Sequence, residues 1–160
     1  HISCRRQRQM CIRDRLYVTH DQAEATTLAD KIGVLKEGHL VQIGTPEEIY
    51  ENPNSIYVSQ RLGSPKINIL PGTLLGMNDV PTFGIRPENI TIGNGDHSAK
   101  IISIENLGSE TVVALNFKDQ EILVSIQGNY KSSINETINF DINNKKVLKF
   151  DQEGNRIYER

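Results

Sequence analysis

The segment around His20 constrains the start of this fold more than any other, because an apolar run ends there and a helix signal begins at the next residue. Asp21 is suited to cap that helix, and Glu24 stands three positions later as a capping-box partner. The pattern predicts a strand over 16–20 and a helix over about 22–31. In an α/β sheet, ligands bind at the carboxyl ends of the strands, so His20 is expected to face a site. The apolar positions of the helix recur at helical spacing, at Ala25, Leu28, Ala29 and Ile32.

Turn and cap residues divide the next part of the chain into short elements. Gly38 interrupts an apolar stretch over 32–43, which predicts a β-hairpin. Thr45 caps a short helix that has proline at its first position and stops at an Asn-Pro pair. Another short helix is expected over 55–61. The Gly-Ser-Pro sequence at 63–65 then marks the expected domain boundary.

From about residue 66 onward, the chain consists of short β-prone runs separated by turn residues. Many short strands at this spacing predict a small antiparallel barrel or sandwich. Asn94-Gly95 is expected to form one of the turns between strands. The predicted strands are 83–85, 90–92, 100–105, 111–117, 121–126, 137–142 and 147–150.

Other polar residues invite a functional interpretation less strongly. Arg86 and Glu88 flank Pro87, and we interpret them as an internal ion pair that fixes a bend, in preference to a ligand site. His39 and His97 occur in polar, turn-like contexts and are expected to be exposed. The four histidines of the chain show no metal-ligand spacing with cysteines or paired carboxylates, so no metal site is predicted.

Several segments, in order along the chain, resemble the ATPase subunits of ATP-binding-cassette (ABC) importers for carbohydrates, of the maltose and glycerol-phosphate type. The resemblance implies the α/β end of a nucleotide-binding domain over 16–62, followed by an all-β, OB-like regulatory domain over 63–160. The matching sequences are Tyr-Val-Thr-His-Asp-Gln at 17–22 with residues 24–25 and 27–30, Gly-Thr-Pro-Glu-Glu-Ile-Tyr at 44–50 with Asn52-Pro53, Gly-Ser-Pro-Lys at 63–66 with Asn68, Gly-Ile-Arg-Pro-Glu at 84–88, and Leu-Gly-Ser-Glu-Thr at 107–111.

The resemblance implies that His20 is the switch histidine, which contacts the γ-phosphate of ATP held between two subunits. Imidazole suits this role, because it forms one directed hydrogen bond and its charge responds to a nearby phosphate. The alternative is a buried histidine that caps the following helix. The cofactors implied are ATP and Mg²⁺. The implied partners are a second ATPase subunit in a homodimer or pair, integral-membrane permease subunits and, indirectly, an extracytoplasmic solute-binding protein, at the cytoplasmic face of a bacterial membrane.

Most of the machinery for ATP hydrolysis is missing from this sequence. It contains no Gly-x-x-x-x-Gly-Lys-Ser/Thr phosphate loop, no apolar strand ending in Asp-Glu, and no Leu-Ser-Gly-Gly-Gln type signature. Phosphoryl transfer depends on backbone amides, a lysine and a metal that position and stabilise the phosphates. We therefore expect the chain to be inactive as an ATPase by itself and interpret it as the C-terminal fragment of a longer subunit.

The first fifteen residues do not fit this pattern. Residues 1–15 contain five arginines and one aspartate, for a net charge of +4, and they hold both cysteines, Cys4 and Cys11. Two interpretations remain: a basic arm for nucleic acid or anionic lipid, or a non-native segment that is excluded from the fold, which we favour. Residues 16–160 carry the remaining net charge of −6.

A different class of function is a free-standing OB-like module. OB folds bind single-stranded nucleic acid through basic grooves with stacking aromatic side chains. The charge of −6 over 16–160 and the absence of tryptophan disfavour such a partner. A regulatory or dimerisation piece without ATPase activity is a further alternative that the sequence leaves open.

Overall fold

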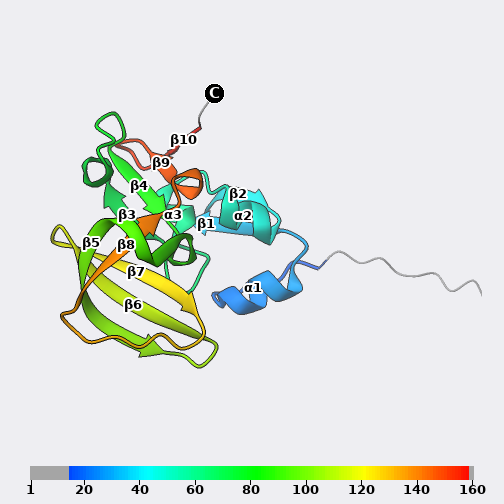
Figure 1. Cartoon of the computed structure of the whole chain (residues 1–160). Helices are drawn as coiled ribbons and strands as arrows, with labels where there is room; N and C mark the ends of the chain where they lie inside the picture. The colour runs from blue at the N-terminus through cyan, green and yellow to red at the C-terminus, as the bar shows by residue number, and fades with distance from the viewer. Residues whose placement is uncertain (1–14, 159–160) are drawn as a thin grey trace, which may run out of the picture.

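Antiparallel strands dominate the structure, a computed structural model that describes residues 15–158 (Figure 1). The prediction for residues 1–15, with Cys4 and Cys11, falls outside the described residues except for Arg15. Two four-stranded sheets have the strand orders β10-β9-β4-β3 and β7-β6-β5-β8. The strands of the first are β3 (Asn68–Pro71), β4 (Thr82–Ile85), β9 (Leu148–Phe150) and β10 (Arg156–Ile157), and those of the second are β5 (Ile90–Asn106), β6 (Glu110–Phe117), β7 (Gln120–Gln127) and β8 (Thr137–Ile142).

The two sheets share one hydrophobic core. Its central side chains come from β4, β5, β6 and β8, and alternate positions along these strands point inward. Three single turns of 3₁₀ helix connect the strands: η1 (Gly72–Leu75), η2 (Pro87–Asn89) and η3 (Asn144–Lys146). The β-rich character expected after residue 63 is confirmed. The most deeply buried core residues include Phe83, Ile85, Ile101, Leu115 and Phe140.

One predicted turn is wrong. Residues 90–92 and 100–105 belong to a single strand, β5, which bends where its register with β8 shifts between Ile92 and His97. Gly95 makes the bend possible, because a Cβ atom at this position would lie 2.1 Å from the carbonyl oxygen of Phe140. A glycine within a strand can thus mark a bulge rather than a chain reversal.

A smaller β-hairpin, followed by two short helices, lies between residue 31 and these sheets. Strands β1 (Ile32–Lys36) and β2 (His39–Gly44) form the expected hairpin, and both turn residues, Glu37 and Gly38, have positive φ, as a type I′ turn requires. Helix α2 (Pro46–Glu51) begins with the predicted cap: the Thr45 hydroxyl accepts from the Glu48 amide, and the Glu48 carboxylate accepts from the Thr45 amide. Helix α3 (Ile56–Ser59) follows. The hairpin and these two helices pack around a small core of their own, which contains Val34, Ile49, Val58 and Leu62.

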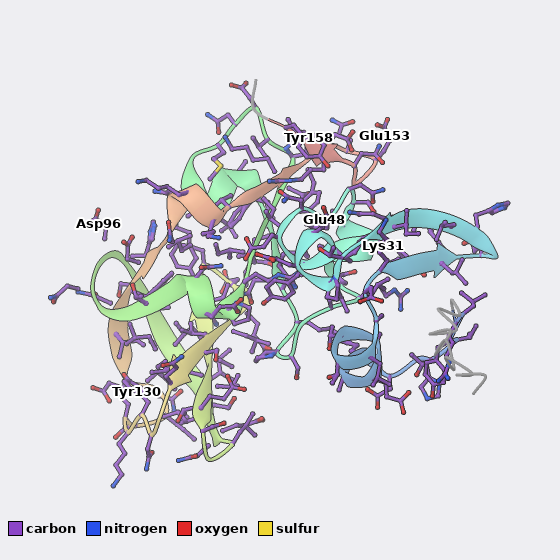
Figure 2. The ribbon with its side chains drawn as sticks, turned by 90° about the vertical axis from the view of Figure 1, so that its right-hand side faces the viewer. Lys31, Glu48, Asp96, Tyr130, Glu153 and Tyr158 are labelled. Atoms are coloured by element: carbon purple, nitrogen blue, oxygen red, sulfur yellow. The ribbon has the colours of Figure 1, made fainter. Side chains whose placement is uncertain are left out.

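The segment before α3 pairs with the turn between β9 and β10. The Ile56 amide donates to the Gly154 carbonyl, and the Arg156 amide donates to the Asn54 carbonyl, each at 2.8 Å. Figure 2 shows Glu48 of α2 in the same half of the molecule as Glu153 and Tyr158, while Tyr130, beyond β7, lies at the other end. No helix within 15–158 is both long enough and apolar enough to cross a bilayer.

Asn68 joins the two sheets through its side chain, which makes it a test of the fold. Its Oδ1 accepts from the Leu123 amide at 2.7 Å and its Nδ2 donates to the Leu123 carbonyl at 2.8 Å, as a strand residue would. Asn68→Ala leaves the partly buried amide and carbonyl of Leu123 without these partners, so we expect a loss of about 2 kcal/mol in the free energy of unfolding. Urea denaturation measures it, with Asn139→Ala, an exposed position of β8, as the control. Equal losses for the two variants would contradict this role.

Candidate functional site

His20 lies on an exposed loop directly before helix α1 (Gln22–Leu28). Asp21 caps this helix as predicted, since its carboxylate accepts from the amides of Ala23 at 2.7 Å and Glu24 at 3.2 Å. The loop on the other side of His20 is also held: the Thr19 hydroxyl donates to the Glu24 carboxylate at 2.7 Å and accepts from the Asp21 amide at 3.0 Å. Hydrogen bonds on both sides therefore fix the backbone that presents the imidazole.

Two details of the predicted capping are wrong. Glu24 does not complete a capping box, because Thr19 takes its place in accepting from the Asp21 amide, and the Glu24 carboxylate binds the hydroxyls of Thr19 and Tyr17 instead. The alternative in which His20 is a buried cap is also wrong, since Asp21 is the cap and His20 is exposed.

The predicted strand over 16–20 is absent. No strand of the described residues lies beside this segment to complete a ladder of hydrogen bonds, and the helix expected to reach residue 31 ends at Leu28. Helix α1 buries none of its residues, and Figure 1 shows it apart from both large sheets. Leu16, Val18 and Leu28 are 96%, 81% and 73% exposed. Apolar side chains at these positions are typical of a segment that packs on another surface.

The described residues offer little else to ATP or Mg²⁺. Within 15–158, no group of three or more histidine, cysteine, aspartate or glutamate side chains is placed to hold a metal ion. No step of phosphoryl transfer is derived from these residues. For a nucleotide phosphate, the exposed imidazole of His20 supplies one possible contact.

A second polar site lies where the first fifty residues of the structure meet the sheets. Arg86, only 4% exposed, follows β4 and points its guanidinium back toward the helices. Its Nη1 donates to the carbonyls of Ser59 at 3.0 Å and Leu62 at 2.6 Å, and its Nη2 donates to the carbonyl of Tyr50 at 3.0 Å. The guanidinium also lies 3.9 Å from the centre of the Tyr50 ring. Arg86 thus holds the ends of α2 and α3 to the sheet.

The predicted ion pair between Arg86 and Glu88 is wrong. Within the described residues the guanidinium has no carboxylate within salt-bridge distance, and Glu88 instead accepts from the Tyr50 hydroxyl at 2.5 Å. Burial lowers the pKa of Arg86, and burial followed by the hydrogen bond to Glu88 raises the pKa of Tyr50. Gly63 is required beside them, because it has a φ of 108° and a Cβ there would lie 3.0 Å from the Arg86 Nη1.

His97 does not lie in an exposed turn as expected. Its ring is partly buried against Phe117 and Phe140, with ring centres 5.4 Å apart in each case. The reason is the bend in β5, which returns residue 97 to the sheet after Gly95. His39, by contrast, is exposed at the start of β2, as predicted.

Comparison with known proteins agrees with this architecture. Residues 83–145 match the family model of the TOBE domain. An sn-glycerol-3-phosphate import ATP-binding protein of Psychromonas ingrahamii is 34% identical, across 90% of this chain and 46% of the relative. An alpha-glucoside transport ATP-binding protein of Rhizobium meliloti is 31% identical, across 87% of this chain and 47% of the relative. An uncharacterized ABC transporter ATP-binding protein of Sinorhizobium fredii is 36% identical, across 70% of this chain and 36% of the relative.

The antiparallel sheets and the family match together define a protein with a TOBE domain. The chain matches the C-terminal region of ATP-binding proteins of ABC importers, among them proteins named for glycerol-3-phosphate and alpha-glucoside transport. It spans about half the length of the curated relatives it matches.

Proposed function

We propose that this chain is the C-terminal part of an ABC importer ATPase subunit, which couples ATP hydrolysis to uptake of a carbohydrate or glycerol phosphate. The observation that carries the proposal is similarity to importer ATP-binding proteins over about nine-tenths of the chain, together with the match of residues 83–145 to the TOBE domain. The division at residue 63, between the end of a nucleotide-binding domain and an OB-like regulatory domain, is part of the proposal.

The proposed role of His20 is to contact the γ-phosphate of ATP as the switch histidine. Its exposure and the hydrogen-bonded loop around it support this role, because a switch residue must reach a ligand from a fixed backbone. The exposed apolar side chains of Leu16, Val18 and Leu28 support a neighbouring part of the subunit that covers them. ATP and Mg²⁺ would be bound mainly by that other part.

The proposed partners follow from the same assignment. A second ATPase subunit would complete the nucleotide sites, permease subunits would carry the solute across the membrane, and a solute-binding protein would act indirectly from outside. The subunit would then lie at the cytoplasmic face of a bacterial membrane. The names of the relatives support an importer, since they describe glycerol-3-phosphate and alpha-glucoside transport.

An ATPase assay on two proteins tests the proposal. The 160-residue chain is expected to release phosphate from Mg-ATP no faster than buffer, because it lacks a phosphate loop and a signature sequence. A subunit in which the same chain follows a nucleotide-binding segment from its source genome is expected to hydrolyse ATP. Hydrolysis by the short chain, or tight oligonucleotide binding with no ATPase activity in the longer protein, would contradict the proposal and favour a free-standing module.

A further inference from the structure

A cavity of about 200 Å³ lies at the junction between helix α2 and the first sheet. Four of the side chains that line this junction cavity are cationic and one is a carboxylate, Glu51. The net charge of the lining is therefore +3, on a chain whose formal net charge is −2. The amide side chains of Asn52 and Asn89 add hydrogen-bonding groups. The cationic residues are Arg86, Lys145, Lys146 and Arg156.

Charge compensation within the junction cavity is incomplete at Arg86 and Lys145, while Arg156 has an interaction of its own and is not counted in this excess. The one carboxylate, Glu51, is committed to Lys146 in an ion pair of 2.9 Å. Arg86 is buried, and no carboxylate of the described residues lies within salt-bridge distance of it. Its buried Nε also has no hydrogen-bond partner there. Burial of a cation is costly. Burial lowers the pKa of Arg86 by more than the charges of Glu88 and Glu51 raise it, and a bound anion would reduce that cost further.

We propose that the junction cavity binds the phosphate group of a small molecule, either free phosphate or a phosphate ester. A phosphate dianion matches the excess positive charge better than a single carboxylate does, and arginine and lysine are the side chains that bind phosphate most strongly. The cavity volume admits a phosphate with a small organic group. This inference does not depend on the proposed ATPase function, because none of the lining residues belongs to the His20 loop.

The position of the junction cavity gives binding a mechanical consequence. Tyr50 and Glu51 come from the end of α2, Arg86 follows β4, and Lys145 belongs to η3. A phosphate held among them links the part of the chain before residue 63 to the part after it. Binding is therefore expected to stabilise this junction, since a ligand that binds only the folded state raises its stability.

Titration of the isotopically labelled 160-residue chain with inorganic phosphate, followed by NMR at pH 8 and constant ionic strength, tests the proposal. Amide shifts are expected to concentrate at Asn52, Asn89 and residues 145–148. Glycerol 3-phosphate serves as a second probe: tighter binding of the ester would show that the cavity takes the organic group, and equal binding would identify free phosphate as sufficient.

Two exposed lining residues give variants with opposite expected effects. Lys145→Gln is expected to weaken phosphate binding about fivefold, because a charged donor is lost. Glu51→Gln is expected to tighten it about twofold to threefold, because the competing carboxylate is removed and Lys146 is released. Lys131→Gln, an exposed lysine outside the cavity, should leave the dissociation constant unchanged. Equal effects of Lys145→Gln and Lys131→Gln, or identical amide shifts with sodium chloride, would overturn the proposal.

Discussion

Replacement of His20 by alanine in the complete ATPase subunit is expected to lower the rate of ATP hydrolysis about a hundredfold or more. Removal of one preorganised group that contacts developing charge costs rates of this order in other enzymes. The loss should fall on kcat, because the proposed contact is to the reacting γ-phosphate and not to the base or ribose. Phosphate release with the reconstituted importer, measured over a range of ATP concentrations, checks the rate and its division between kcat and KM.

The structure indicates that His20→Ala will not act through misfolding. Asp21, and not His20, caps α1, and the Thr19–Glu24 hydrogen bond holds the loop without the imidazole. A matched control is His39→Ala, which removes an exposed histidine at the start of β2. It should leave the rate of hydrolysis unchanged. A rate for the His20 variant within about twofold of the parent subunit would remove His20 from the site.

Replacement of Arg86 by methionine is expected to lower the free energy of unfolding by about 3 kcal/mol. The variant keeps an apolar stem but leaves the carbonyls of Tyr50, Ser59 and Leu62 without their donor, and each unsatisfied buried group costs about 1–3 kcal/mol when it cannot reach water. Water can partly reach these carbonyls in the variant, so the total loss of stability is expected to be smaller than the sum of the three individual costs. Urea denaturation of the 160-residue chain, followed by circular dichroism, measures the change.

Arg61→Met is the matched control for this variant. Arg61 is an exposed arginine whose guanidinium lies 4.1 Å from the centre of the Tyr57 ring, so its replacement removes a stacked cation but no buried hydrogen bond. Its expected cost is about 0.5–1 kcal/mol. If the two variants lose the same stability, Arg86 does not hold the helices to the sheet as the distances indicate.

The success of the sequence-based expectations depended on how far apart the interacting residues lie. The cap of α2 at Thr45 and the turn at Gly38 were both predicted, because each depends on residues within four positions of one another. The strands predicted over 111–117, 121–126 and 137–142 were also placed closely, since alternation and turn residues are local signals. Strands β3 and β10 were missed, because they have only four and two residues, which is too short for a clear alternating pattern.

The two candidate sites also differ in how much of them the sequence predicted. The sequence predicted that His20 lies next to a helix cap, and the resemblance to importer ATPases implied its role. The sequence did not predict that the segment before His20 forms no strand. That segment lacks a neighbouring strand within the described residues, and hydrogen-bonded ladders require one. The junction cavity had no sequence signal, because its lining residues are spread from Tyr50 to Arg156.

By itself, the sequence determined the order of the hairpin, the capped helices and the β-rich region, and the resemblance to importer ATPases. Tertiary structure alone decided where Arg86 binds, how Asn68 joins the two sheets, and that Gly95 bends a continuous strand. The physical reason is that the polar groups of helix caps and turns form their hydrogen bonds with residues that are close in the sequence. A buried guanidinium or amide, in contrast, is satisfied by whichever distant backbone groups the packed core brings within hydrogen-bond distance.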